Sequence, residues 1–452
     1  MPDVNDTIVS EITPPGRGGV RVVRLSGRLS ISILKALFRS RGSRSPWNYP
    51  RLLVQGEILD GKERVLDFGM AVWFKAPASF TGEQVVEIHC HGSGGVIRSL
   101  KGACEAMGAR PALPGEFSFR AVLNGKMSVM QAEAVNALVD SETALQAGSV
   151  SGIVAGRTGE RMQGLRQKLL ALQADMDARL DFPEDTAAYR PSDDVARMRE
   201  LEDEMGAVLS DAVRGRSLRE GWRIALCGAP NVGKSSLFNA FLQRDRAIVS
   251  PHPGTTRDLL EETLDLAGYP VVLIDTAGVR KSEDPVEKLG VERGLGAARN
   301  AEGVLLLFDM TAGWGDGEQS LLRQVGEKVI ALVGTKADLV NETYGAVPDR
   351  EFCALSSLDG KGLDAVARRV ASWAEERSPR EETELVSERQ TASLREATGF
   401  LREARAAIEA GQTEEAAVPH LHRAQEAMDA LLGHMSPEAL YDEIFSRFCI
   451  GK

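Results

Sequence analysis

The chain has 452 residues and a formal net charge of -11, with 26% charged and 43% hydrophobic residues. This composition is that of an ordinary globular protein and excludes a collagen-like, fibrous or broadly disordered chain. The acidic balance argues against a protein that coats nucleic acid. No apolar stretch of about 18 residues predicts a membrane span. The first residues lack the basic and apolar segments of a secretory signal, so we expect a cytoplasmic protein.

The cysteines are few and scattered, and no two form a CxxC pair. Their odd number and wide spacing argue against a disulfide framework and a zinc ribbon, and predict reduced thiols. They are Cys90, Cys104, Cys227, Cys353 and Cys449.

Positive charge is concentrated near the start of the chain. No acidic residue occurs from Ile12 to Arg51. Two interpretations of this segment are open: a solvated basic face, or a surface that binds phosphate or an anionic cofactor. Its basic residues are Arg17, Arg21, Arg24, Arg28, Lys35, Arg39, Arg41, Arg44 and Arg51.

Residues 1–120 contain short apolar runs such as RVVRLSG, FGMAVWFKAP and QVVEIHCHG, broken by Gly and Pro. This pattern predicts strands and turns, and therefore an α+β domain. Within the last run, alternation along a strand directs Cys90 away from His89 and His91, which argues against a metal site there.

Residues 121–216 and 379–452 have helical patterns. One apolar stripe, with spacings of three and four, predicts a long helix. Ser436 followed by Pro437 predicts an N-cap and a first helical residue. We expect the two helical parts to pack together, because neither alone buries much core. The stripe consists of Met162, Leu165, Leu169, Leu172, Met176 and Leu180.

Residues 217–378 alternate between strand and helix patterns. The strand candidates are WRIALCG, YPVVLIDTAG, GVLLLFDM, KVIALVGTKAD and EFCALSS. Such alternation predicts a mostly parallel sheet flanked by helices, here inserted into the helical domain.

A phosphate-binding loop, GAPNVGKS at 228–235, follows the first of these strands and precedes the helical run SLFNAFL. Its glycines allow backbone N–H groups to surround a phosphate, and the helix N-terminus adds positive potential. Lys234 is predicted to reach the β- and γ-phosphates, and Ser235 to bind Mg²⁺. The candidate nucleotide contacts of this loop are Asn231, Val232, Gly233, Lys234, Ser235 and Ser236.

Two loops downstream are candidates to sense the γ-phosphate. PHPGTTRD, residues 251–258, contains Thr255 and Thr256, and Thr256 is the predicted second Mg²⁺ ligand. DTAG follows a strand, so that Asp275 can hold the metal through water and the Gly278 N–H can contact the γ-phosphate. The predicted contacts of that motif are Asp275, Thr276, Ala277 and Gly278.

TKAD, residues 335–338, ends another strand and predicts the choice of base. The carboxylate of Asp338 can accept hydrogen bonds from guanine N1 and its 2-amino group, which adenine cannot supply. Thr335 stands where Asn is commoner, so we expect weaker nucleotide affinity with retained specificity. Lys336 and Ser356 complete the predicted guanine contacts. Together these motifs predict a Ras-like GTPase domain.

The residue after the DTAG motif is Val279, where Ras-type enzymes place a Gln that orients the attacking water. A cation held by Asn231 could neutralise developing charge instead. Glu287 is the candidate to position water. Arg257 and Arg280 are alternative charge donors.

The chain resembles the MnmE (TrmE) family of tRNA-modification GTPases over nearly its whole length. The resemblance rests on DTIVSEITPPGRGGVRVVRLSG, PASFTGEQVVEIHCHG and PGEFSFRAVLNGKMSVMQAEAV, then on GAPNVGKSSLFNAF, PGTTRD and DTAG, and finally on FSRFCIGK. It implies a folate-binding, aminomethyltransferase-like N-terminal domain that forms a homodimer. It also implies a helical domain, into which the GTPase domain is inserted.

The resemblance further implies site residues. Contacts to 5,10-methylenetetrahydrofolate or 5-formyltetrahydrofolate would fall on Arg24, Glu87, Lys126 and Lys452. Contacts to K⁺ would fall on Asn231, Ser250, His252 and Thr255. Glu287 matches the family's catalytic glutamate, and Cys449 in FCIGK is either a nucleophile beside the folate or a structural thiol.

The implied activity needs a flavoprotein partner, MnmG, which forms a heterotetramer with the protein and carries FAD and NADH. Together they would add an aminomethyl or carboxymethylaminomethyl group to C5 of the wobble uridine in certain tRNAs. GTP hydrolysis would drive domain rearrangement. The alternative is a ribosome-associated regulatory GTPase without modifying activity.

Overall fold

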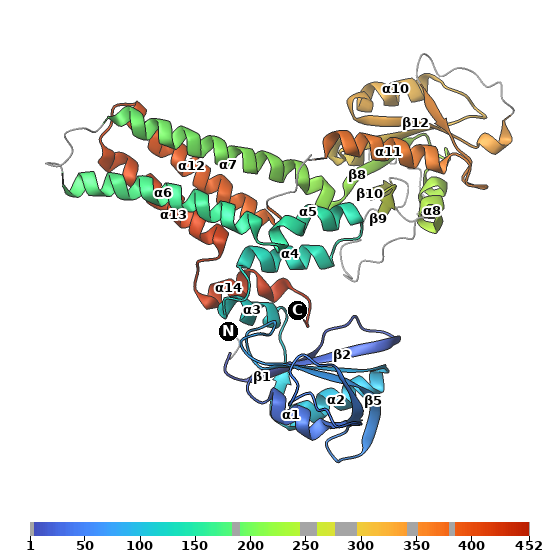
Figure 1. Ribbon diagram of the computed structural model, residues 1–452. Coiled ribbons are helices and arrows are strands. Elements are labelled where there is room, and N and C mark those ends of the chain that lie inside the picture. Colours follow the sequence, from blue (N-terminus) through green and yellow to red (C-terminus); the bar gives the residue numbers. More distant parts are fainter. Residues whose placement is uncertain are drawn as a thin grey trace, which may run out of the picture. The chain divides into compact units, whose positions relative to one another are not determined.

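The computed structural model describes residues 4–182, 190–244, 260–275, 296–340, 351–378 and 385–451. The chain forms two compact units. The first contains residues 1–136, 154–201 and 393–452, and the second contains residues 137–153 and 202–392. Each unit therefore combines segments that are far apart in the sequence, as the colours of Figure 1 show.

The first unit begins with a seven-stranded sheet in the order β3-β4-β5-β6-β2-β1-β7. Neighbouring strands are antiparallel, except that β1 and β7 are parallel. The strands predicted from RVVRLSG, FGMAVWFKAP and QVVEIHCHG are confirmed as β2, β5 and β6. The strand bounds are β1 Thr7–Glu11, β2 Gly18–Ser26, β3 Phe38–Ser40, β4 Val54–Leu59, β5 Val65–Phe74, β6 Val85–Gly92 and β7 Ala109–Pro111.

Helices α1 (Ser30–Leu37) and α2 (Gly94–Ala106) pack on one face of this sheet, as Figure 1 shows. Because side chains alternate along a strand, only every second strand residue faces these two helices. Leu25 and Cys90 are buried in that core, whereas Arg24 lies on the other face. Cys90 thus faces away from its two histidine neighbours, as predicted, and burial raises the pKa of its thiol to about 11.

Helices form the remainder of the first unit. The apolar stripe is confirmed on α6, where Met162, Leu165, Leu169, Leu172 and Met176 are buried. Helix α6 packs against α13, so the two helical parts of the sequence meet as predicted. Ion pairs join them at Arg166–Asp429 and at Arg179–Glu414. The helices of the first unit are α3 Glu116–Leu123, α6 Arg157–Asp181, α13 Glu414–Leu432 and α14 Pro437–Glu443. Helices α4 Val129–Val139, α7 Pro191–Glu220 and α12 Glu388–Glu409 contribute residues to both units, and α5 Ala144–Val154 belongs almost wholly to the second.

The C-terminal segment packs against the start of the helical region. The Ser436 hydroxyl accepts a hydrogen bond from the Ala439 N–H, which confirms the predicted N-cap of α14. Beyond it, Tyr441 and Phe445 make edge-on contacts with the ring of Phe119 in α3. Aromatic burial of this kind holds the tail to a helix that lies more than three hundred residues earlier in the chain.

The second unit contains a six-stranded sheet in the order β13-β12-β11-β8-β10-β9. All pairs are parallel except β10 with β9. The five predicted strands are confirmed, and β9 was not predicted because its residues alternate with acidic side chains. The bounds are β8 Trp222–Gly228, β9 Leu260–Leu266, β10 Tyr269–Asp275, β11 Gly303–Asp309, β12 Val329–Thr335 and β13 Phe352–Ala354, with helices α8 Lys234–Arg244, α10 Asp316–Val325 and α11 Leu363–Arg377.

Apolar clusters cover both faces of this sheet, as a parallel sheet requires. One contains Leu237 and Phe241 of α8 with Val366 and Val370 of α11, and the other contains Leu322 of α10. Across the described ranges, no helix combines the length and the hydropathy that a membrane span needs.

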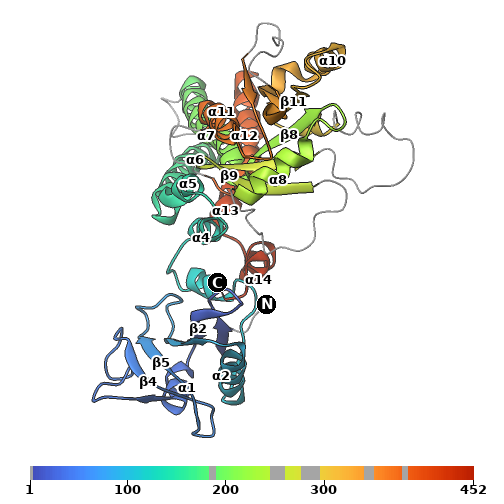
Figure 2. The same ribbon diagram turned by 90° about the vertical axis from the view of Figure 1, so that its right-hand side faces the viewer.

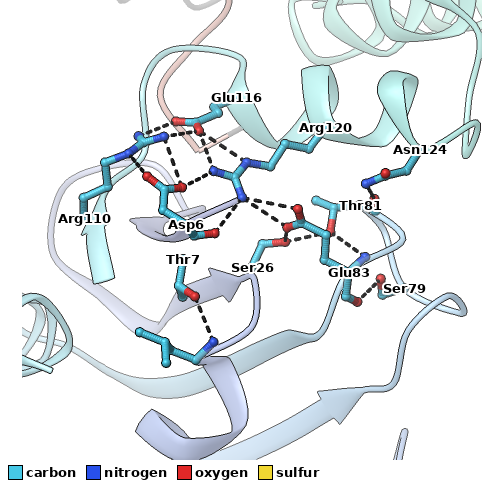
Figure 3. A network of polar contacts seen from close by, with 11 residues as sticks. Asp6, Thr7, Ser26, Ser79, Thr81, Glu83, Arg110, Glu116, Arg120 and Asn124 are labelled. Atoms are coloured by element: carbon cyan, nitrogen blue, oxygen red, sulfur yellow. Dashed lines mark hydrogen bonds and ion pairs between the residues drawn. The ribbon is translucent and has the colours of Figure 1, made fainter. Parts of the chain in front are cut away.

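A network of buried charges joins the sheet of the first unit to α3 (Figure 3). Arg120 and Glu116 are fully buried and their side chains lie 2.9 Å apart. Arg120 also contacts Asp6 at 2.6 Å and Glu83 at 3.3 Å, and Arg110 contacts both Glu116 and Asp6. Buried charges are stable only when they are paired in this way.

The network predicts a large stability loss for Arg120→Met. The substitution leaves the buried carboxylates with fewer positive partners, and we expect the free energy of unfolding to fall by about 3 kcal/mol. Urea unfolding followed by circular dichroism measures it. The matched control is Arg64→Met, whose guanidinium is exposed beside Asp60 and should leave stability nearly unchanged. Equal effects of the two substitutions would contradict a stabilising role for the network.

Candidate functional site

The phosphate-binding loop joins β8 to α8 at the centre of the second sheet. Strand β8 lies between β10 and β11, so the chain order reverses at this point. Ligands of open α/β sheets bind at such a switch point, outside the carboxyl ends of the strands. Gly228 has a φ of +154°, and a Cβ there would lie 2.5 Å from the carbonyl oxygen of Leu307. Only glycine fits this close approach.

Lys234 and Asp275 lie at the same edge of the sheet. The Lys234 ammonium donates to the carbonyl oxygens of Gly228 at 3.0 Å and Ala229 at 2.8 Å. Burial lowers the pKa of Lys234, and the negative charge of Asp275 opposes part of that effect. Asp275 is buried at the end of β10, beside Leu226 of β8. This edge of the sheet thus presents the Lys234 cation and the Asp275 carboxylate where phosphate and metal would bind.

Thr335 connects the phosphate-binding loop to the sheet. Its side chain is buried, and its hydroxyl lies 2.6 Å from the carbonyl oxygen of Val232 and 3.0 Å from that of Phe308. One side chain therefore links the loop after β8 with the ends of β11 and β12. The sequence indicated this residue as a nucleotide contact, whereas its described contacts are all with the protein backbone.

The TKAD loop is held against the loop that follows β13. The N–H of Ala337 donates to the carbonyl oxygen of Leu355 at 3.0 Å, and the N–H of Leu355 donates to that of Gly334 at 2.7 Å. Asp338 is exposed beside this junction, and Ser356 is buried directly after Leu355. The two segments predicted to read the base are therefore adjacent.

Asp309 holds Lys336 in place, a role that no motif indicated. The Lys336 ammonium lies 2.5 Å from the Asp309 carboxylate, and its backbone has a φ of +58°. Burial would raise the pKa of Asp309, but hydrogen bonds from Lys336 and Thr311 outweigh it and lower the pKa. The ion pair orients the Lys336 stem along the edge where the base is expected.

A second cluster lies on the face of the first sheet opposite α1 and α2. Arg24 of β2 and Glu87 of β6 are register partners, and two guanidinium nitrogens of Arg24 lie 2.9 and 2.7 Å from one Glu87 oxygen. The rings of Phe80 and Phe117 lie 5.1 and 5.6 Å from the Arg24 guanidinium. Burial would raise the pKa of Glu87, whereas His89 and Arg24 lower it, and the net pKa is lowered.

Lys126 borders this cluster through the loop that contains Phe80. A Cβ on Gly82 would lie 3.3 Å from the Lys126 side chain. The same loop is held by Asn124, whose amide donates to the Thr81 carbonyl oxygen at 2.7 Å, and by the Thr81 hydroxyl, 2.6 Å from that of Ser26 (Figure 3). Lys126 itself is exposed, so its ammonium is available to a ligand.

The C-terminal tail reaches the same part of the sheet. The Gly115 N–H donates to the Cys449 carbonyl oxygen at 3.3 Å, and Ile450 forms a bridge with Pro114. A Cβ on Gly451 would lie 2.5 Å from the Glu11 carbonyl oxygen at the end of β1. The Cys449 side chain is exposed. The tail thus lies beside β1 and the start of α3, which both neighbour Arg24.

Some predicted site residues lie outside the described ranges. They are Ser250, His252, Thr255, Thr256, Thr276, Ala277, Gly278, Glu287 and Lys452. Of the others, Asn231 has a φ of +59° within the phosphate-binding loop, and Ser235 and Ser236 are exposed in the first turn of α8. The described nucleotide residues converge on one sheet edge, and Arg24, Glu87 and Lys126 converge on one face of the other sheet.

The phosphate-binding loop, the acid after β10 and the paired loops after β12 and β13 define a P-loop GTPase. Two family models match the chain: "GTP-binding protein TrmE N-terminus" over residues 7–126 and "MnmE helical domain" over residues 129–449. The chain belongs to the MnmE family.

Two MnmE proteins agree with this assignment. The tRNA modification GTPase MnmE of Synechococcus sp. (strain JA-3-3Ab) is 39% identical over 452 residues, which cover 99% of this chain and 98% of that protein. The MnmE of Thermus thermophilus is 40% identical over 451 residues, which cover both chains completely. Among solved structures, the G domain of the T. maritima FeoB iron transporter is 28% identical, covers 34% of this chain and 98% of that chain, and has a TM-score of 0.25.

The bridging role of Thr335 predicts the effect of Thr335→Val, which preserves the side-chain shape but removes the hydroxyl. The carbonyl oxygen of Val232 loses its buried donor, at a cost of about 1–3 kcal/mol. We expect roughly 5- to 150-fold weaker GDP binding in a fluorescent-nucleotide titration. The control, Thr263→Val on strand β9, should bind normally. Unchanged affinity of Thr335→Val would show that the loop does not depend on this hydroxyl.

Proposed function

We propose that this protein is a K⁺-dependent GTPase that modifies tRNA together with the flavoprotein MnmG. The product is an aminomethyl or carboxymethylaminomethyl group at C5 of the wobble uridine, and GTP hydrolysis drives domain rearrangement. The main support is the likeness, over the whole chain, to proteins named tRNA modification GTPase. The second cluster, with the tail beside it, gives the chain a possible one-carbon site in addition to its GTPase site.

The nucleotide roles follow from the chemistry of the side chains. Lys234 neutralises the β- and γ-phosphates, and Ser235 with Thr256 would hold Mg²⁺, with Asp275 acting through water. Ser235 is exposed at the start of α8 and Asp275 lies at the neighbouring strand end, so the described residues fit a hard cation with oxygen ligands. Bound Mg²⁺ would neutralise charge on the phosphate oxygens. Asp338 would accept the guanine N–H donors.

Hydrolysis requires groups other than a Gln after the DTAG motif. We propose that Asn231, Ser250, His252 and Thr255 hold K⁺ and that Glu287 positions the attacking water. Asn231 supports this role by its place in the phosphate-binding loop and its exposed amide. Bound K⁺ would offset the negative charge that develops as the phosphoryl group leaves.

Arg24, Glu87, Lys126 and Lys452 form the proposed folate site. The Glu87 carboxylate suits N–H donors of a pterin, and the lysines suit anionic glutamate. The described part fits such a ligand, because the Arg24 guanidinium lies near two aromatic rings and Lys126 remains exposed. Cys449 is proposed as a nucleophile beside this site; its side chain is exposed, so burial near the C-terminus does not explain this thiol.

The proposed domains are a folate-binding and dimerisation domain at 1–120, helical parts at 121–216 and 379–452, and the GTPase domain at 217–378. We propose a homodimer that joins MnmG as a heterotetramer in the cytoplasm. The competing function is a ribosome-associated regulatory GTPase that modifies nothing.

Mass spectrometry of wobble-uridine nucleosides tests the function directly. In tRNA from a strain that lacks the gene, we expect the C5 modification to disappear and to return with a plasmid copy. A plasmid that encodes Lys234→Ala provides the control for the need for GTP. An unchanged nucleoside profile would contradict the modifying activity and favour the ribosome-associated alternative.

The cation role predicts that GTP turnover is faster in K⁺ than in Na⁺ at equal ionic strength. Asn231→Ala should remove this difference while GTP binding remains measurable. Phosphate release assays in the two salts provide the comparison. Equal rates of the wild type in K⁺ and Na⁺ would count against the cation site.

The folate site predicts that Lys126→Ala weakens tetrahydrofolate binding, because an exposed cation that pairs with the ligand's carboxylates is lost. Calorimetric titration measures the affinity, and light scattering checks that the dimer persists. Lys62→Ala, an exposed lysine of the same domain, is the control. If both variants bind folate as the wild type does, Lys126 has no part in the site.

A further inference from the structure

A basic cavity lies at the edge of the first sheet, away from the Arg24–Glu87 pair. Its volume is about 630 Å³, and α1, β3, the following loop and the β4–β5 turn surround it. Figure 2 shows α1, β4 and β5 close together in this part of the chain. None of the residues around the Arg24–Glu87 pair lines it. Its polar and aromatic lining includes Lys35, Arg39, Ser40, Arg44, Trp47 and Glu63.

The cavity contains some of the basic residues that carboxylates leave uncompensated. Arg17, Arg28 and Arg51 of the same segment also make no ion pair within the described ranges, but they do not line the cavity. Elsewhere in the segment, Arg21 pairs with Glu11 and Arg24 with Glu87. Among the described residues, neither Lys35 nor Arg44 belongs to an ion pair. A solvated basic face would need no cavity, so the structure favours the second interpretation of this segment, a surface that binds an anion.

One carboxylate is shared between two arginines beside the cavity. Glu57 of β4 lies 3.2 Å from Arg39 and 3.8 Å from Arg41, and the Arg41 guanidinium also lies 4.4 Å from the centre of the Phe68 ring. The pairing orients the guanidinium groups along the rim but leaves one positive charge in excess. With Lys35 and Arg44 added and Glu63 opposed, the cavity is clearly electropositive.

The loop that carries these charges is well supported. Ser45 and Pro46 are buried, and Trp47 packs against the core of the sheet while it lines the cavity. The Asn48 and Tyr49 N–H groups both donate to the Ser45 carbonyl oxygen. A loop held in this way can present its side chains with little loss of conformational entropy on binding.

Neutral groups in the cavity also suit a phosphate ligand. The Ser40 hydroxyl is buried behind the lining and makes no hydrogen bond within the described part of the chain. Gly42, which has no side chain, and the small Ser43 line the cavity and allow close approach of a backbone. The Arg44 guanidinium lies 5.8 Å from the centre of the half-exposed Tyr49 ring, which supplies an aromatic surface beside the charges.

We propose that this cavity binds the sugar–phosphate backbone of the tRNA substrate. Phosphodiesters carry permanent negative charge, and proteins bind single-stranded nucleic acid with basic grooves that are bordered by aromatic rings. Three separate cations, Lys35, Arg39 and Arg44, line the cavity, which fits the repeated phosphates of a strand better than a single phosphate. The proposal rests on the modifying function proposed above, because that function supplies the tRNA.

The test uses full-length protein and unmodified tRNA, with binding followed by fluorescence anisotropy at several salt concentrations. The variant is Lys35→Ala with Arg44→Ala. The binding constant K falls as salt rises, and each lost phosphate contact makes the slope of log K against log salt less steep by about 0.7–0.9. For two lost contacts we expect a slope less steep by about 1.5 and roughly 30-fold weaker binding at 0.1 M salt. The variant should hydrolyse GTP and unfold thermally as the wild type does.

Two matched variants show whether tRNA binding depends on positive charge in the cavity or only on the total charge of the domain. Arg17→Ala with Arg98→Ala removes the same charge from exposed residues of the same domain outside the cavity, and should change the slope little. Lys35→Arg with Arg44→Lys keeps the charges in the cavity and should retain tRNA binding. The proposal fails if the two alanine double variants bind tRNA equally well, or if the wild-type protein alone does not bind it.

A parallel calorimetric titration with inorganic phosphate distinguishes a tRNA backbone from a small phosphate as the ligand of the cavity. If phosphate binds the wild type but not the cavity variant, while both bind tRNA equally, the cavity serves a small phosphate ligand and the proposal is overturned. The nucleoside analysis of the deletion strain remains independent of this result. The proposed modifying function can therefore be correct even if the cavity does not bind tRNA. If the modifying function is wrong, the nucleoside profile of the deletion strain will be unchanged.

Discussion

The buried guanidinium of Arg120 is the interaction on which the first unit depends most. It joins the residue before β1, the loop that precedes β6 and helix α3, through Asp6, Glu83 and Glu116. The loop reached through Glu83 carries Phe80 against Arg24 and Gly82 against Lys126. The helix carries Phe117 against Arg24 and Phe119 against the C-terminal tail. The proposed folate site is therefore built from segments that this one ion network holds together.

Two side-chain contacts connect the parts of the GTPase site in a similar way. The hydroxyl of Thr335 connects the backbone of the phosphate-binding loop to two strand ends, and Asp309 fixes the lysine that follows it. Both contacts hold protein groups in place around the predicted nucleotide site. Residues at the end of a strand are suited to this role, because parallel strands bring their carboxyl ends to one edge. Phosphate binding and base reading are thereby mechanically joined through β11 and β12.

The distribution of charge reconciles an acidic protein with an anionic substrate. The net charge of -11 would repel tRNA on average. At the Debye length of physiological salt, about 8 Å, a local group of uncompensated cations matters more than the distant total. The cavity beside β3 provides such a group, and the remaining arginines of the basic segment that pair with Glu11 and Glu87 are used within the fold.

The sequence by itself determined the features that lie within short, continuous stretches. The phosphate-binding loop, the strands around it, the stripe on α6 and the orientation of Cys90 were all readable, because periodicity and motif spacing act over a few residues. Only the tertiary structure decided which distant groups meet. Arg120 and Asp6 are 114 positions apart, Thr335 and Val232 are 103 apart, and Tyr441 reaches Pro114 across 327. The partner of a buried charge or hydroxyl depends on the packing of whole elements, and no local pattern encodes that choice.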